Sequence, residues 1–255
     1  MPASQSLVLT RLQEGVLTLT LDHPKVNAIN TTMLHSLSAA FDDAARDPQV
    51  CCLVLTGAGD TFSAGQDLSE AVQAADLSYR DHLLQTYNPL VLQIRRLEKP
   101  VLAAINGAVS GAALGLALAC DLRIAADTAR LVVGFLGIGL VPDSGVSLFL
   151  PALVGLGRAG ELAFLNEPLP ASQALSWGLV NRVVPAADLP RETLAWAKEL
   201  SKRPIQAIGL AKRAFNKAVL SNLEEVLDYE AHLQEIAHRG VEHQAALQAF
   251  HTKSR

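Results

Sequence analysis

The feature that most restricts the fold is an uncharged stretch of twenty residues, Val101 to Cys120, which reads VLAAINGAVSGAALGLALAC. About 20 apolar residues are enough for a helix to cross a bilayer. Three glycines also recur at the four-residue spacing found where membrane helices pack, namely Gly107, Gly111 and Gly115. However, Asn106 and Ser110 lie inside the stretch. We expect a buried strand, a turn at Asn106-Gly107 and a buried helix, because nothing else in the chain resembles a lipid-facing segment.

The overall composition excludes several classes of protein. Of its 255 residues, 50% are apolar and 18% are charged, which excludes disordered and coiled-coil chains. A net charge of -4 without long basic runs predicts no nucleic-acid or membrane partner, so we expect a small ligand. The cysteines form no framework of spaced bridges, the first residues lack the basic and apolar regions expected of a signal peptide, and no H-E-x-x-H or C-x-x-C motif is present. We therefore expect a cytoplasmic protein without a metal site.

Apolar periodicity predicts an α/β fold with a largely parallel sheet. A hairpin is expected at 6–11 and 15–22, and short buried strands at 50–57, 101–105 and 122–126. Helices are expected at 31–46, 81–97, 171–178, 191–202, 204–220 and 222–250. The pattern divides the chain into a core of residues 1–195 and a helical region of residues 196–255, which we expect to pack on the core or on another subunit.

Two turns rich in glycine and alanine follow neighbouring predicted strands. They are TFSAGQDL at 61–68 and NGAVSGAA at 106–113, and each leads into a helix. Such turns leave backbone N–H groups free at a helix N-terminus, where they stabilise negative charge. Two of them side by side could form an oxyanion hole, and the absence of bulky side chains would let a substrate approach closely. Ordinary tight joints between strand and helix explain the spacing equally well.

One carboxylate stands out in this part of the chain. Asp143 lies in the turn GIGLVPDSG at 137–145, after an uncharged run that begins at Leu131. Apolar surroundings raise the pKa of a carboxyl group, which suits it for proton transfer near neutral pH. An Asp followed by Ser-Gly and an apolar helix is also a good helix N-cap, and both roles can coexist. Asp121 and Asp127 bracket a short strand, where carboxylates usually act as caps or hydrogen-bond partners.

Four segments together resemble the crotonase, or enoyl-CoA hydratase/isomerase, superfamily. They are LDHPKVNAIN at 21–30, FSAGQDL at 62–68, VLAAINGAVSGAALGLALACDLRIAA at 101–126 and GLVPDSG at 139–145. The similarity covers nearly the whole chain. It implies a spiral of ββα units with a C-terminal helical extension, assembly as a homotrimer or a hexamer, and an acyl-CoA thioester substrate with no separate cofactor.

The resemblance also assigns roles to particular residues. The oxyanion hole would consist of the backbone N–H groups of Gln66 and Ala112, which hold the thioester oxygen as an enolate forms. The residues that it places near coenzyme A are Lys25, Ser63, Ala64, Asp67, Gly111 and Lys253.

Departures from the family pattern bear on the reaction. Hydratases of the family carry two glutamates at positions that here hold Gly115 and Phe135. Asp143, in contrast, falls where dienoyl-CoA isomerases and isomerases of the phenylacetate pathway keep an aspartate. The resemblance therefore implies an isomerase that shifts a double bond or opens an epoxide ring in phenylacetate catabolism, with Asp143 as the proton shuttle. A hydratase of the fatty-acid β-oxidation type and a catalytically idle acyl-CoA-binding relative are the alternatives.

Overall fold

Two sheets form the centre of the computed structural model, which describes residues 6–73 and 78–253. Within this part of the chain the larger sheet has six strands in the order β1-β2-β3-β5-β7-β10, and its pairs are parallel apart from the β1–β2 hairpin. Its strands are β1 (Val8–Gln13), β2 (Val16–Leu21), β3 (Cys52–Gly57), β5 (Val101–Ile105), β7 (Leu122–Ala126) and β10 (Arg182–Val184). The smaller sheet contains β4 (Thr61–Ser63), β6 (Ala108–Ser110), β8 (Arg130–Val132) and β9 (Leu169–Pro170).

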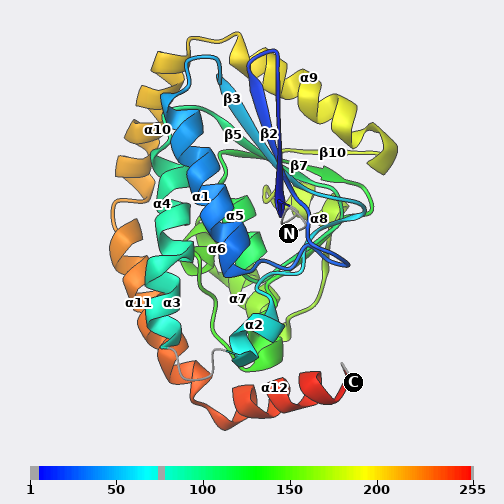
Figure 1. The fold of residues 1–255 in the computed structure, drawn as a ribbon, viewed down its shortest axis with the longest axis vertical. Helices are drawn as coiled ribbons and strands as arrows, with labels where there is room; N and C mark the ends of the chain where they lie inside the picture. The colour runs from blue at the N-terminus through cyan, green and yellow to red at the C-terminus, as the bar shows by residue number, and fades with distance from the viewer. Residues whose placement is uncertain (1–5, 74–77, 254–255) are drawn as a thin grey trace, which may run out of the picture.

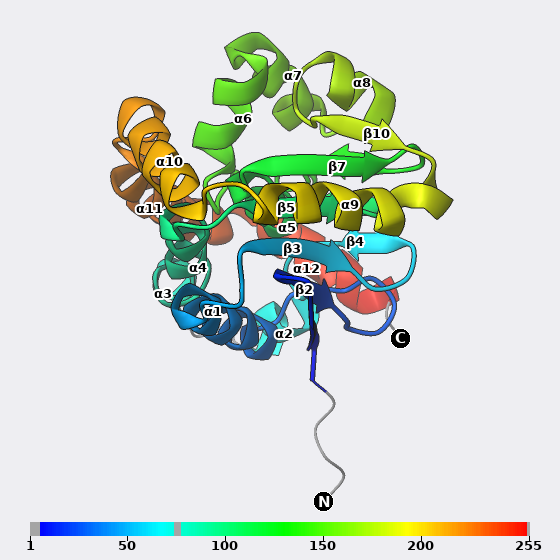
Figure 2. The same cartoon turned by 90° about the horizontal axis from the view of Figure 1, so that it is seen from above.

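Helices cover both faces of the larger sheet, which is why β3 and β5 are buried almost throughout. Helix α9 packs on β2, β3, β5 and β7 (Figures 1 and 2), and α10 and α11 run along one side of the molecule with α12 across its end (Figure 1). The helices of the first half are α1 (Thr31–Arg46), α2 (Leu68–Gln73), α3 (Tyr79–Gln85), α4 (Tyr87–Arg96) and α5 (Ala112–Ala119). Those of the second half are α6 (Val146–Val154), α7 (Leu156–Leu165), α8 (Ala171–Ser176), α9 (Leu189–Ser201), α10 (Ile205–Val219), α11 (Leu223–His238) and α12 (Val241–Lys253), and two short 3-10 helices cover Leu136–Ile138 and Ala186–Asp188.

The predicted ββα repeat is present. Strands β3 and β4 precede α2, strands β5 and β6 precede α5, and strands β7 and β8 precede α6. In each repeat the first strand joins the larger sheet and the second joins the smaller one, where β4, β6 and β8 pair in parallel. Consequently the chain leaves β4 and β6 side by side, and the two turns singled out in the sequence begin at adjacent strands.

Local sequence explains why α1 forms where it does. The Asn30 side chain accepts a hydrogen bond from the Met33 N–H at 2.9 Å, which caps the helix N-terminus. The buried residues of this helix follow helical spacing and belong to the core: Met33, Leu34, Leu37, Phe41 and Ala44. One helix face therefore anchors the helix on the sheet, as the periodicity predicts.

The uncharged stretch contains two strands and a helix. It forms β5, β6 and the eight-residue α5, with the turn at Asn106-Gly107 as expected, and every residue of α5 is buried. In the parts of the chain that the structure describes, no helix is both long enough and apolar enough to span a membrane. The lack of charge reflects burial inside the protein.

Two predicted helices are in fact pairs of helices. The one expected at 81–97 is divided into α3 and α4 at Thr86, because Pro89 has no N–H to donate to the Gln85 carbonyl group. The one expected at 222–250 is divided into α11 and α12 at Gly240. The proposed boundary between residues 195 and 196 falls inside α9, which packs on the larger sheet.

Candidate active site

The turns after β4 and β6 approach each other closely. Gly65 has a φ of +94° and Gly111 has a φ of +58°, a region that favours glycine. A Cβ atom at Gly65 would lie only 2.8 Å from the Ser110 carbonyl oxygen and 3.6 Å from the Ala112 nitrogen. The backbone contact between the two turns thus requires a residue without a side chain at position 65.

Several N–H groups in these turns have no protein acceptor among the described residues, including those of Gln66 and Ala112. In the first turn, the N–H groups of Ala64 and Asp67 donate to backbone carbonyl groups, and that of Gly65 donates to the Ser63 hydroxyl. No such acceptor exists for the N–H of Gln66, nor for that of Ala112 at the start of α5. These are the two groups for which the family resemblance implies an oxyanion hole. The structure places them in adjacent turns with their hydrogen-bonding capacity unused.

Asp143 lies in the turn between β8 and α6, where its side chain is buried. One carboxylate oxygen accepts a hydrogen bond from the Ser144 hydroxyl at 2.8 Å, and the other accepts one from the Gln234 side-chain amide at 2.7 Å. The Asp143 carboxylate does not cap α6, whose preceding residue is Gly145. Instead the N–H groups of Gly145 and Ser147 donate to Glu230, at 2.8 and 3.0 Å. The carboxylate of Asp143 is therefore available for chemistry.

Burial controls the ionisation of Asp143. Removal from water raises the pKa of this carboxyl group to about 6, although the hydrogen bonds from Gln234 and Ser144 oppose that effect. No lysine or arginine is among the groups that affect it. A carboxyl group with a pKa near 6 is largely ionised at neutral pH yet binds a proton readily, as proton transfer to and from carbon requires.

A cavity of about 190 Å³ connects Asp143 to both turns. Its polar lining comes from the turns, Tyr79 and Asp143, and its apolar wall comes from α2, the segment before α6 and the short helix at Leu136–Ile138. The lining residues are Ala64, Gln66, Leu68, Tyr79, Ser110, Gly111, Ala112, Gly134, Phe135, Ile138, Leu140 and Asp143. The cavity thus brings together Gln66 and Ala112, which carry the unpaired N–H groups, and Asp143.

Gly115 has a steric role beside Asp143. A Cβ atom at position 115 would lie 2.7 Å from both the Cβ and the carbonyl oxygen of Ser144. Ser144 itself has a φ of +55°, so the Asp143 turn is sharply bent towards α5. Thus this turn and a side chain at position 115 compete for the same space. Phe135, at the other position where hydratases of the family carry a glutamate, is buried in the cavity wall.

Sequence reasoning missed the side chains that hold the site from a distance. The Tyr79 hydroxyl donates to the Gln66 side-chain oxygen, and the Gln66 side-chain nitrogen lies 3.4 Å from His82 Nε2. Burial lowers the pKa of His82, which favours the neutral ring that can accept this hydrogen bond. On α11, Gln234 and Glu230 hold the Asp143 turn. The sequence showed that these side chains lie among apolar or helical residues, but it did not show which residues they contact.

The residues predicted to lie near coenzyme A differ in exposure and in hydrogen bonding. Lys25 is exposed in the turn before α1, and Ala64 and Gly111 line the cavity. The Ser63 hydroxyl is buried and bonded to Asn27 and Gly65, whereas Asp67 accepts hydrogen bonds from Ser69 at the start of α2. The Lys253 side chain lies outside the described residues.

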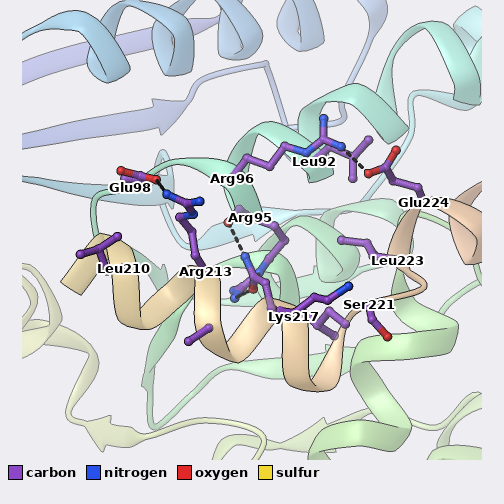
Figure 3. Close-up of a pocket in the computed structure, with 13 residues that line it drawn as sticks. Leu92, Arg95, Arg96, Glu98, Leu210, Arg213, Lys217, Ser221, Leu223 and Glu224 are labelled. Carbon is purple, nitrogen blue, oxygen red and sulfur yellow. Dashed lines mark hydrogen bonds and ion pairs between the residues drawn. The ribbon is translucent and has the colours of Figure 1, made fainter. Parts of the chain in front are cut away.

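A larger cavity of about 780 Å³ lies between α4 and α10 (Figure 3). Its charged side chains largely pair with one another or with nearby polar groups: Arg96 with Glu224, Arg213 with Glu98, and Arg95 with Asn216. Cys52 and Cys120 offer no alternative nucleophile, because burial raises the pKa values of their thiols to about 12. Asp143 and the two turns remain the best candidate for an active site.

The chain is similar to a known family and to individual known proteins. The chain matches the family model described as "Enoyl-CoA hydratase/isomerase" over residues 11–255. It is 38% identical over 252 residues to "1,2-epoxyphenylacetyl-CoA isomerase" of Escherichia coli (strain K12), covering 96% of this chain and 95% of the relative. It is also 38% identical over 240 residues to a "Probable enoyl-CoA hydratase" of Rhodobacter capsulatus, covering 94% and 92%.

A solved structure has the same fold. The crystal structure of an enoyl-CoA hydratase from Mycobacterium avium subsp. paratuberculosis K-10 matches with a TM-score of 0.87 and 32% sequence identity, covering 97% of this chain and 96% of the other. The match spans both sheets and the helical C-terminal part. The chain therefore belongs to the enoyl-CoA hydratase/isomerase family.

Proposed function

We propose that the protein is an acyl-CoA isomerase that shifts a double bond, or opens an epoxide ring, in an unsaturated coenzyme A thioester. The observation that carries this proposal is the single ionisable carboxylate of Asp143, buried in a cavity that also contains the unpaired N–H groups of Gln66 and Ala112. The relative that isomerises 1,2-epoxyphenylacetyl-CoA supports a role in phenylacetate catabolism.

The proposed mechanism uses one base and one oxyanion hole. The thioester oxygen accepts hydrogen bonds from the N–H groups of Gln66 and Ala112, which stabilise the negative charge as it develops. Asp143 removes a proton from a carbon next to the double bond, and the electron pair moves onto the thioester oxygen to give an enolate. The protonated Asp143 then returns that proton to a different carbon, which moves the double bond and restores the carboxylate.

A hydratase is the second candidate, because a probable hydratase is as similar to the chain as the isomerase is. Hydration needs one group to activate water and another to manage the proton on carbon 2. Gly115 and Phe135 provide neither, and Ser144 leaves no room for a side chain at position 115. Both observations favour isomerisation.

Replacement of Asp143 by Asn tests the assignment. We expect isomerisation of 3-enoyl-CoA to 2-enoyl-CoA to fall by about 10³-fold, because general acid–base catalysis is lost while the shape of the side chain is retained. Hydration of 2-enoyl-CoA should be slow in the wild type. Hydration that survives in the variant would contradict the proposal, and acyl-CoA binding without turnover in the wild type would identify an idle relative.

Ala112→Pro tests the oxyanion hole. Proline is tolerated at the first position of a helix, so this change removes one N–H group at the start of α5. We expect kcat to fall by about 10²-fold or more. Ala113→Gly, which keeps every N–H group in the turn, serves as the control. A loss of less than about tenfold in a folded Ala112→Pro variant would mean that the hole lies elsewhere.

We propose further that the substrate is held by Lys25, Lys253 and the backbone near Ala64, and that the chain assembles as a trimer or a dimer of trimers. Exposed apolar side chains on α7 and α10 support assembly, including Phe164 and Phe215, which are 76% and 68% exposed. Light scattering on the purified protein would test the oligomeric state. Lys25→Ala should raise KM for acyl-CoA and leave kcat unchanged.

A further inference from the structure

A second buried carboxylate lies behind the Asp143 turn, and the mechanism does not use it. Glu230 on α11 has an exposed fraction of only 2% and does not line the cavity. Its carboxylate accepts hydrogen bonds from the N–H groups of Gly145 and Ser147 and from the Ser147 hydroxyl. All three donors belong to the turn or to the first residues of α6. Glu230 thus supplies the N-terminal cap of α6 from another helix.

Gln234 holds the other side of the same turn. It lies one helical turn after Glu230 on α11 and is also fully buried. Its side-chain oxygen accepts a hydrogen bond from the Val141 N–H at 3.0 Å, and its nitrogen donates to the Val141 carbonyl group at 2.9 Å and to Asp143 at 2.7 Å. The segment 141–147 is therefore fixed to α11 at both ends, with Asp143 between the two attachments.

We propose that Glu230 is a positioning residue for the reaction: its ionised carboxylate fixes the turn at 143–147, and through that turn the direction of the Asp143 carboxylate. This inference rests on the proposed function of Asp143. The two backbone N–H groups bound to Glu230 can only donate, and the ionised carboxylate accepts them as charge-assisted hydrogen bonds at the N-terminus of α6. When Glu230 gains a proton, this negative charge is lost and the attachment of α6 to α11 weakens.

The ionisation of Glu230 falls in the working range of the enzyme. Burial raises its pKa to about 7, the hydrogen bonds from Ser147 and Gly145 oppose this effect, and the charge of Asp143 raises the pKa further. On α3, which packs on α11, Arg80 pairs with Asp228 and Asp81 is exposed to solvent. Helix α6 carries no charged residue. Asp143 is thus the charge that acts on Glu230.

Glu230→Gln in the full-length protein tests the proposal. The glutamine amide matches the size of the carboxylate but turns an NH₂ group towards backbone donors. We expect kcat for isomerisation at pH 8 to fall by about 10- to 100-fold, as loss of a charge-assisted hydrogen bond implies, with KM changed by less than about threefold. Asp228→Asn, an exposed change on the same helix, is the matched control and should leave both values unchanged.

The pH dependence separates positioning from a merely structural role. In the wild type, kcat should begin to fall near pH 7 as Glu230 gains a proton, and should fall more steeply below pH 6 as Asp143 does. In Glu230→Gln only the second decline should remain, so the ratio of wild-type to variant kcat should shrink from pH 8 to pH 6. A folded variant with unchanged kcat, or with a ratio independent of pH, would overturn the proposal.

Ser147→Ala replaces this test if Glu230→Gln does not fold. It removes one donor to Glu230 and leaves the carboxylate in place, so we expect a smaller loss of kcat, about three- to tenfold, and a decline that begins above pH 7. Unchanged kcat and pH profile in this variant would also overturn the proposal. Full activity in Asp143→Asn, in contrast, would refute the proposed function itself. The two failures are therefore distinguishable.

Discussion

Asp121 and Asp143 are two carboxylates at the ends of uncharged segments, and the protein surrounds them in opposite ways. Asp121, which is 19% exposed in its side chain, pairs with Arg95 at 3.0 Å and with Lys212 at 2.8 Å, and also accepts a hydrogen bond from the Val101 N–H. The Asp143 carboxylate is buried and, within the part of the chain that the structure describes, receives hydrogen bonds only from the neutral side chains of Ser144 and Gln234. Both their neighbours and their depth in the fold distinguish the two sites.

The difference teaches what makes a buried carboxylate reactive. Two cations pair with Asp121, which joins α4, α10 and the start of β5, so its role is structural. Neutral donors orient Asp143 but stabilise its charge less, so burial raises its pKa to about 6. The first site joins three elements of the fold, whereas the second retains a carboxylate whose pKa suits proton exchange near neutral pH.

The largest expected effect comes from Asp121→Asn, which removes the ion pairs of Asp121 with Arg95 and Lys212. Lys212 has a side chain only 5% exposed, and it would lose its charged partner. We expect the free energy of unfolding to fall by about 2–4 kcal/mol. Isomerisation by the molecules that remain folded should stay within about twofold of the wild type, against the loss of about 10³-fold for Asp143→Asn. Urea denaturation and kcat measured on the same samples would check both values.

The second prediction concerns stability as a function of pH. Because the pKa of Asp143 is raised to about 6 in the folded protein, its contribution to stability is present below its ordinary pKa near 4 and is lost as the pH rises through 6. Asp143→Asn removes this dependence. The variant should therefore gain stability relative to the wild type between pH 4 and 6, by up to about 3 kcal/mol. If the difference in unfolding free energy between the variant and the wild type were constant from pH 4 to 6, Asp143 would not titrate in that range.

The smallest expected effect comes from Ser144→Ala, which measures how one neutral donor affects the pKa of Asp143. The change removes the hydroxyl group that donates to Asp143. The pKa of Asp143 should rise, because the ionised form loses a hydrogen bond, and the acidic decline of kcat should move upward by about one pH unit or less. Stopped-flow rates across the pH range would reveal the shift. A downward displacement would mean that the hydroxyl group favours the protonated carboxyl.

Local sequence was sufficient for the elements that carry the site. The apolar run before Asn106, the glycines at positions 65 and 111 and the apolar surroundings of Asp143 were visible without a structure. They predicted the buried strands and the two adjacent turns because strand burial and turn geometry depend on residues close in sequence. The division of the expected helix at 81–97 was missed, although Pro89 marks it.

The sequence by itself determined which groups can react: a carboxylate among apolar residues and two turns with few side chains. Only the tertiary structure decided which groups control them. Gln234 lies 91 residues after Asp143 and Glu230 lies 85 residues after Gly145, and neither separation follows any helical or strand period. Likewise, the conflict between a side chain at Gly115 and the backbone of Ser144 exists only after α5 and the Asp143 turn have packed together. Hydrogen bonds and steric contacts act over a few ångströms in space, so partners distant in sequence are set by the fold.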